Sequence, residues 1–181
     1  QATLIAPTGT IGFMLDFDSF GVEPGLALAS QKSLSGGGKL DIVSQSVEPA
    51  LRKLGYSDGE IAGIKSYILE EAVGENGKKY QVHPWINEGT PGIKPEHIPI
   101  FATALGANAV SAEAHLGMMG ATQPFLSGAI SKTVNLPKGT TTEEIESIYV
   151  RSHQMGLKSV ALYIDGSKGD VQPMMIGGQI E

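Results

Sequence analysis

The stretch Ala6-Pro7-Thr8-Gly9-Thr10-Ile11-Gly12 decides how the beginning of the chain folds. The residues just before it, 2–6, are mostly apolar and too few for a helix, which predicts a short buried strand. Pro7 lacks the N–H that a strand ladder needs, so we expect it to end this strand. The hydroxyls of Thr8 and Thr10 follow, and each can cap a helix or bind an anion.

Two glycines complete this stretch, and they are compatible with a bound ligand. Gly9 and Gly12 let the backbone approach a bound group closely because they carry no side chain. Residues 11–17 then predict the beginning of a helix. A strand, a turn rich in Gly and Thr, and a helix start direct free N–H groups to one point, which suits a phosphate. The same pattern also serves as a plain strand-to-helix connection, so both interpretations stay open at this point.

Composition is that of an ordinary soluble globular chain, with 181 residues, 41% hydrophobic, 18% charged and a net charge of -6. A chain of this length can bury a core of its own. The acidic balance offers no basic surface to nucleic acid. No apolar run approaches the ~18 residues of a membrane span, and the first residues lack the basic start of a signal peptide. We therefore expect no nucleic-acid partner and no membrane partner.

Cysteine is absent from the sequence, which excludes disulfides, thiolate metal sites and thiol catalysis by this chain. Its absence agrees with a cytoplasmic location. The first residue is Gln1 rather than Met, and the first predicted strand begins at once. A natural domain rarely begins within a strand, so we expect the chain to be part of something longer or of a split protein.

Helix signals outline the first half of the chain. Ser46 can cap a helix that ends before Gly55. Ser57-Asp58-Gly59-Glu60 is a capping box for a second helix, which is expected to run to about Val73. Residues 74–99 are rich in Gly, Pro and charge, which predicts a loop-rich insert with at most short helical turns.

The second half alternates helices with strands. In order, the signals predict a helix from Ser111 to Pro124, a strand over 129–136, a helix from Thr140 or Thr141 to Gly156, a strand over 159–164 and a tail over 169–181. Such alternation predicts an α/β fold with parallel strands. Three strands cannot close a barrel, so we expect residues 1–181 to form a single partial domain.

Several blocks of the sequence resemble class II ribonucleotide reductases, which are the adenosylcobalamin-dependent enzymes. The resembling blocks are Ala6–Gly12, Gly21–Pro24, Leu51–Tyr56, Met118-Met119, Gln123–Pro137, Gly156–Lys158, Ala161–Tyr163 and Asp165–Lys168. They occur in the order of the family and cover nearly the whole chain. The block Gln123–Pro137 is the longest and the most specific.

The resemblance implies a fold, a substrate and a cofactor. The chain would be the C-terminal portion of a ten-stranded α/β barrel that encloses a radical-bearing finger loop. The substrate would be a ribonucleoside di- or triphosphate whose phosphates are held by Pro7, Thr8, Gly9, Thr10 and Ile11. Adenosylcobalamin would bind mostly outside this segment, and the partner would be the remainder of the reductase catalytic chain. The family's radical cysteine, redox cysteine pair and glutamate are expected upstream, so we assign no catalytic residue here.

Other polar side chains are weaker candidates for binding a metal, a phosphate or a cofactor. The four histidines show no metal-binding spacing, so no metal site is predicted. Asp16 and Asp18 could hold a magnesium ion through water, or could form a solvated acidic loop. Lys132 could reach a phosphate or a cofactor side group, or could be an exposed strand lysine. No role follows from the sequence for Glu23.

Two other functions stay open at this stage. One is a phosphate- or nucleotide-binding module without catalysis, and the other is a structural subunit that docks onto a separate catalytic chain. A finger-loop cysteine with its nearby glutamate in the adjacent upstream coding sequence would favour the reductase over both.

Overall fold

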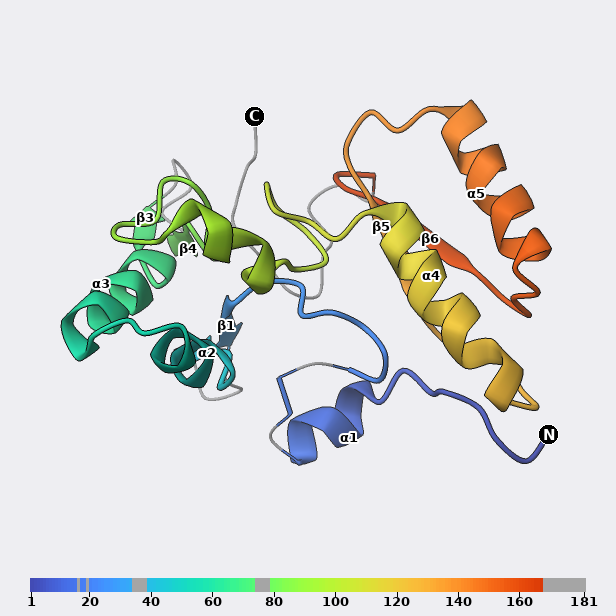
Figure 1. Cartoon of the computed structure of the whole chain (residues 1–181), viewed down its shortest axis with the longest axis horizontal. Helices are drawn as coiled ribbons and strands as arrows, with labels where there is room; N and C mark the ends of the chain where they lie inside the picture. The colour runs from blue at the N-terminus through green and yellow to red at the C-terminus, as the bar shows by residue number, and fades with distance from the viewer. Residues whose placement is uncertain (16, 19, 34–38, 74–78, 168–181) are drawn as a thin grey trace. The chain divides into compact units, whose positions relative to one another are not determined.

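The structure of the protein is a computed structural model that describes residues 1–15, 17–18, 20–33, 39–73 and 79–167 (Figure 1). The described residues gather into two compact units. Unit 1 contains residues 1–25 together with the described part of 110–170, and unit 2 contains the described part of 26–109. Each unit has its own hydrophobic core. That residues 1–181 belong to a single partial domain stays a prediction.

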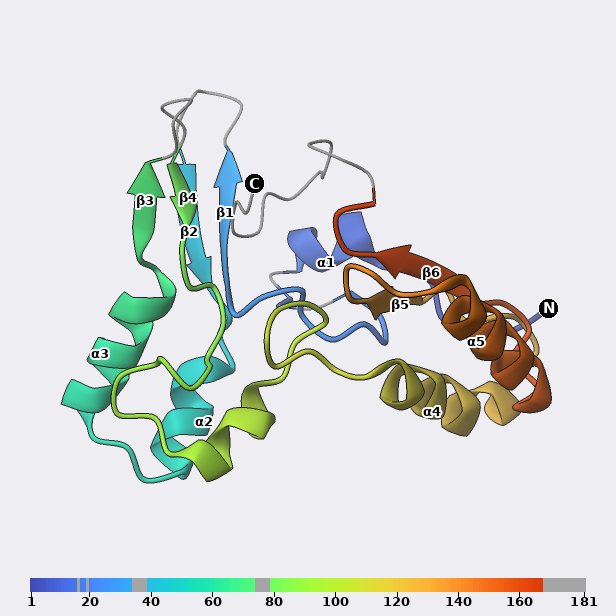
Figure 2. The same ribbon diagram turned by 90° about the horizontal axis from the view of Figure 1, so that it is seen from above.

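Unit 1 combines two parallel strands with helices. Its elements are α1 (Gly9–Met14), α4 (Ala112–Thr122), the short helix η2 (Gln123–Phe125), β5 (Thr133–Leu136), α5 (Thr142–Gln154) and β6 (Ala161–Ile164). Strands β5 and β6 pair in parallel, with Thr133 opposite Ala161 and Leu136 opposite Ile164. Helices α4 and α5 lie on the same side of these two strands in Figure 2, and Figure 1 gives the other view of this unit. The predicted parallel α/β arrangement is thereby confirmed for this pair of strands.

The core of unit 1 follows from the alternation of side chains along residues 130–136. Ile130, Val134 and Leu136 are buried and pack with Leu116 and Met119 of α4. Successive side chains of an extended chain point to opposite faces. The even-numbered positions therefore face the helices, and the odd-numbered positions face away from them.

Helix ends in unit 1 follow the predicted signals. The Ser111 hydroxyl accepts a hydrogen bond from the Ala114 N–H and caps α4. Thr141, rather than Thr140, forms the capping box with Glu144 that begins α5. Gly156 has a φ of +73°, the left-handed conformation in which glycine commonly ends a helix.

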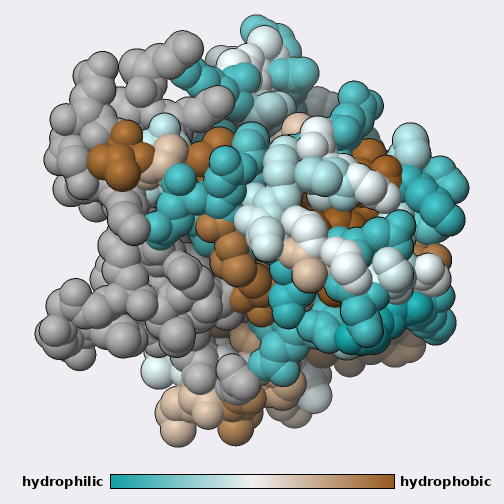
Figure 3. Space-filling view, turned by 90° about the vertical axis from the view of Figure 1, so that its left-hand side faces the viewer, coloured by the Kyte–Doolittle hydropathy of each residue, from teal (hydrophilic) through white to brown (hydrophobic). Residues whose placement is uncertain are grey.

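Unit 2 is built from two antiparallel hairpins and three helices. Its elements are β1 (Ala29–Ser33), β2 (Lys39–Val43), α2 (Val47–Lys53), α3 (Asp58–Ile68), β3 (Glu71–Val73), β4 (Lys79–Gln81) and the short helix η1 (Pro95–Phe101). The core includes Leu51 of α2 and Ile64 and Ile68 of α3, which are fully buried. Hydrophilic side chains predominate among the coloured residues in Figure 3, and hydrophobic ones occur there in smaller areas.

Two predictions about this half of the chain were wrong in detail. The helix expected to reach Val73 ends at Ile68, because residues 71–73 pair instead with residues 79–81 as an antiparallel hairpin. The insert predicted over 74–99 contains the strand β4, which was not predicted, and most of η1, which agrees with the predicted short helical turns; residues 74–78 lie outside the described residues. The predicted tail, 169–181, lies outside them as well.

Residues 2–6 also differ from the buried strand that the sequence predicts. Ile5 forms one isolated parallel bridge with Ile130, and Leu4 is 57% exposed. Among the described residues, this segment pairs through a single bridge and is mostly exposed, so it forms a bridge rather than a buried strand. The described residues form no closed barrel, and they contain antiparallel hairpins that the alternation of helices and strands does not predict. Within the described part of the chain, no helix is both long and apolar enough to cross a membrane.

Candidate functional site: the turn after Ile5

The turn at Pro7–Ile11 begins a helix earlier than predicted. Helix α1 begins at Gly9 rather than at Ile11, and the Gly12 N–H donates to the Thr8 carbonyl over 2.8 Å. Thr8 has a φ of +53° and is the non-glycine residue with positive φ among the described residues. In a left-handed position a side chain costs about 1–2 kcal/mol. The backbone therefore turns sharply at Thr8, and the first N–H groups of α1 have no partner within the helix.

A set of hydrogen bonds holds the segment before this turn against the residues that precede β5. The Ser127 hydroxyl accepts from the N–H groups of Ala2 and Thr3 at 2.8 and 3.0 Å. The Gly128 N–H donates to the Thr3 carbonyl at 2.7 Å, and the Ser131 N–H donates to the Ile5 carbonyl at 2.9 Å. A Cβ at Gly128 would lie 2.8 Å from the Thr3 carbonyl oxygen, so only glycine permits this approach.

The five predicted phosphate-binding residues differ in exposure. Pro7, Thr10 and Ile11 are exposed, whereas Thr8 and Gly9 are half-buried. A Cβ placed on Gly9 would meet no atom within 4 Å, so the space in front of this residue is open. The turn therefore presents backbone and hydroxyl groups to solvent, which is the arrangement that an incoming anion requires.

A hollow of about 400 Å³ lies beside the turn in unit 1. Its lining comes from three neighbouring segments, residues 4–7, 129–133 and 159–161, with Gln1. Pro7 is the predicted site residue that lines it. The hollow contains the hydroxyl-bearing residues Ser131, Thr133 and Ser159 among apolar neighbours, so it can accommodate a small, partly polar group.

Lys132 is one of the residues that line this hollow, and it makes a buried ion pair that its sequence did not predict. Its Nζ lies 3.0 Å from Glu23 Oε2, and the lysine side chain is only 1% exposed. The expectation of an exposed strand lysine was wrong, because Lys132 lies on the even-numbered face that packs against α4. That alternation was the signal available in the sequence. A lysine on a buried face needs a carboxylate partner.

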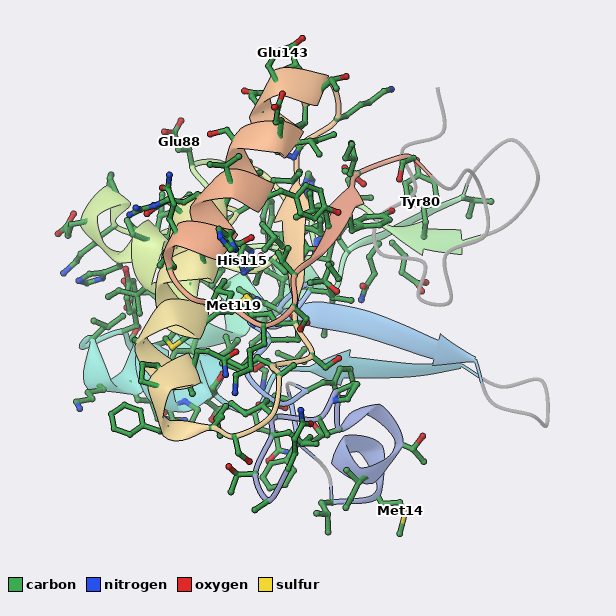
Figure 4. The ribbon with its side chains drawn as sticks, turned by 90° about the vertical axis from the view of Figure 1, so that its right-hand side faces the viewer. Met14, Tyr80, Glu88, His115, Met119 and Glu143 are labelled. Carbon is green, nitrogen blue, oxygen red and sulfur yellow. The ribbon has the colours of Figure 1, made fainter. Side chains whose placement is uncertain are left out.

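His115 of α4 completes this cluster. Its Nδ1 lies 2.7 Å from Lys132 Nζ, and its Nε2 is buried with no hydrogen-bond partner among the described residues. Figure 4 shows His115 and Met119 pointing from α4 toward the strands. Burial, with a smaller contribution from the charge of Lys132, lowers the pKa of His115 to about 4. The ring is therefore neutral at pH 7, with Nδ1 as the acceptor and the proton on Nε2, since an ammonium group can only donate.

Metal-binding and catalytic groups are few in the described residues. They contain no group of three His, Asp or Glu side chains that could hold a metal ion. His97 Nδ1 pairs with the Tyr56 hydroxyl at 2.8 Å, and the His83 ring stacks on Tyr67. Asp16 lies outside the described residues, so the predicted acidic loop is described only in part. The chain supplies no thiol nucleophile, because its sequence contains no cysteine.

Comparison with known proteins gives one consistent family. The family model described as "Ribonucleotide reductase, barrel domain" matches residues 1–163. A vitamin B12-dependent ribonucleotide reductase of Streptantibioticus cattleyicolor is 46% identical over 168 residues, which is 93% of this chain and 26% of the relative. The corresponding enzyme of Streptomyces coelicolor is 45% identical over 93% of this chain and 16% of the relative.

A more distant relative carries a related name. The vitamin B12-dependent ribonucleoside-diphosphate reductase of Mycobacterium tuberculosis is 29% identical over 93% of this chain and 21% of the relative. The chain thus spans between about a sixth and a quarter of the length of these relatives. The family model matches residues 1–163, and the first of these relatives is similar over 93% of the chain. The chain therefore belongs to the ribonucleotide reductase barrel-domain family.

Proposed function

We propose that this chain is part of a vitamin B12-dependent ribonucleotide reductase, which in its complete form converts ribonucleotides to deoxyribonucleotides. The observation that carries this proposal is the similarity to such reductases over 93% of the chain. The partner of the chain is the remainder of the catalytic domain, and together they form the ten-stranded barrel. The substrate is a ribonucleoside di- or triphosphate.

The role of this chain in that enzyme is to bind the phosphates of the substrate with Pro7–Ile11. Three features support this assignment: the sharp turn at Thr8, the exposed Thr10 hydroxyl, and the open space in front of Gly9. Free N–H groups at the beginning of a helix attract anions, and hydroxyl groups add directed hydrogen bonds. The chain positions the nucleotide, and the chemical steps belong to residues outside it, since it contains no cysteine.

Adenosylcobalamin supplies the radical in this proposal and binds mostly outside this chain. One ring nitrogen each of His115 and His97 is already engaged, by Lys132 and by Tyr56. We assign no contact with the cofactor to the described residues.

The phosphate assignment is tested with Thr8→Val and Thr10→Val in the complete reductase. Each change removes one hydroxyl, and a charge-assisted hydrogen bond is worth about 1.5–3 kcal/mol, or roughly ten- to hundredfold in affinity. We expect CDP and CTP, measured by calorimetry, to bind more weakly but still detectably, because the backbone N–H groups remain. Gly9→Val should weaken binding further, because its side chain would occupy the open space in front of the turn.

Gly117→Ala is the matched control for the glycine variant. A Cβ added to Gly117 would also meet no atom within 4 Å, but this residue lies within α4, away from the turn. We expect it to leave nucleotide affinity unchanged and to stabilise α4 slightly. Threonine and glycine variants that stay folded and bind both nucleotides as tightly as the wild type would refute the phosphate assignment.

A further inference from the structure

The buried ammonium group of Lys132 is fully used by its own surroundings. It has three N–H donors, and it donates to Glu23 Oε2 at 3.0 Å, to His115 Nδ1 at 2.7 Å and to the Thr133 carbonyl at 3.2 Å. No donor is left for a ligand in the hollow beside it. Lys132 therefore acts on neighbouring residues of the chain rather than on a bound group.

Glu23 is held at both of its carboxylate oxygens. Oε2 accepts from Lys132, while Oε1 accepts from the Thr133 N–H at 2.7 Å. A carboxylate bound at both oxygens has a fixed position and orientation. These bonds join residue 23 to the first residue of β5, 110 positions later in the sequence.

The residues that lead up to Glu23 lie next to the Pro7–Ile11 turn. Gly21 has a φ of +60°, and a Cβ there would lie 2.7 Å from the Ala6 carbonyl oxygen and 3.6 Å from Thr8 Oγ1. Val22 packs against the core of unit 1, and the Glu23 N–H donates to the Phe20 carbonyl at 3.0 Å. The position of Glu23 thus determines how closely Gly21 supports the residues on either side of Pro7.

We propose that Lys132 and Glu23 are positioning residues that hold the Pro7–Ile11 turn in its binding conformation. This inference rests on the proposed function of that turn. The chain of contacts runs from Lys132 and the Thr133 N–H to Glu23, from Glu23 along the backbone to Gly21, and from Gly21 to Ala6 and Thr8. Thr8 occupies a strained conformation, which persists only when its surroundings impose it.

The experiment compares three variants of the complete reductase with the wild type. Lys132→Met removes the charge and keeps an apolar stem, Glu23→Gln removes the opposite charge, and the double variant removes both. The control is Glu113→Gln, which breaks the exposed ion pair between Glu113 and Arg151 on the same unit. Affinity for CDP and CTP, melting temperature and hydrogen exchange of residues 1–15 are measured for each protein.

We expect both single variants to bind the nucleotides roughly tenfold more weakly, since misplacing one charge-assisted hydrogen bond to phosphate costs about that factor. Hydrogen exchange should become faster at residues 9–12. The double variant should recover much of the melting temperature, because it leaves no unpaired buried charge. It should not recover the affinity, because the hydrogen bond from Lys132 that fixes the side chain of residue 23 is still missing. Glu113→Gln should match the wild type in all three measurements.

A purely structural ion pair gives a different result. The single variants would then melt earlier but bind nucleotides as tightly as the wild type, and the double variant would restore every property; either finding overturns the proposal. If the single variants fail to fold, the double variant decides by its affinity alone.

Thr8→Val separates the two proposals. If it weakens binding while the Lys132 and Glu23 variants do not, only the positioning role fails. If the wild type binds neither nucleotide, both proposals fail.

Discussion

His115 shows how one buried residue can make stability depend on pH. Its ring nitrogen accepts from Lys132, and a proton on that nitrogen would face an ammonium group with no acceptor between them. The pKa is about 4 in the folded protein against an ordinary value of 6.5. Between these values the unfolded chain binds a proton that the folded chain does not. The stability that His115 provides is therefore complete above pH 6.5 and is lost as the pH falls toward 4.

The resulting prediction compares the wild type with His115→Asn at pH 7 and pH 5. The Asn side-chain oxygen can take the place of Nδ1 as an acceptor for Lys132, but it does not titrate. We expect the wild type to lose up to about 2 kcal/mol more stability than the variant between these pH values, given about 1.4 kcal/mol per pKa unit. Thermal unfolding of the complete reductase measures this difference. Equal losses in the two proteins would show that His115 titrates normally.

Helix α5 is the element whose formation depends most clearly on local sequence. The Thr141 hydroxyl accepts from the Glu144 N–H at 3.2 Å, and the Glu144 carboxylate accepts from the Thr141 N–H at 2.8 Å. Thr141→Ala removes the first bond and should cost about 1 kcal/mol, which corresponds to roughly fivefold faster hydrogen exchange in the first turn. Thr142→Ala, at an exposed neighbouring position, is the control and should have little effect. Unchanged exchange in Thr141→Ala would mean that packing of α5 alone fixes its beginning.

At the scale of the whole molecule, the role we propose for the chain is to bind a nucleotide, and we assign no chemical step to it. It has no cysteine, and β5 and β6 form only a two-stranded parallel sheet within the described residues. Large side chains of the first segment are exposed, including Met14 at 79% and Phe17 at 63%, and Figure 4 shows Met14 on the outer side of α1. Exposed apolar surface of this kind is typical of residues that another part of a protein covers.

We therefore expect the 181-residue chain by itself neither to reduce nucleotides nor to bind adenosylcobalamin tightly. Turnover of CDP and CTP with a dithiol reductant, compared with a reaction without protein, measures the first property. Titration of the cofactor followed by absorbance measures the second. Product formation above the control would contradict the assignment of all chemical steps to residues outside this chain.

The sequence by itself determined the features that depend on neighbouring residues. It identified the caps at Ser57 and Ser111, the helix end at Gly156 and the parallel relation of the last two strands, and it placed the cap of α5 at Thr140 or Thr141. Caps and periodic faces lie within a few residues of one another, so their physical causes are visible in the order of amino acids. The blocks that resemble the reductase family were equally visible, and the family is confirmed.

Only the tertiary structure decided which distant residues meet. The pairing of Glu23 with Lys132 joins positions 109 residues apart, and no local pattern says which carboxylate will neutralise a buried lysine. The hairpin of β3 and β4 replaced the last predicted turn of α3 for the same reason, since hydrogen bonds to a strand partner outweigh weak helix propensity. The sequence located the turn at Pro7–Ile11, while its support by Gly21 required the folded backbone, because that support is a contact between atoms and not a pattern of residues.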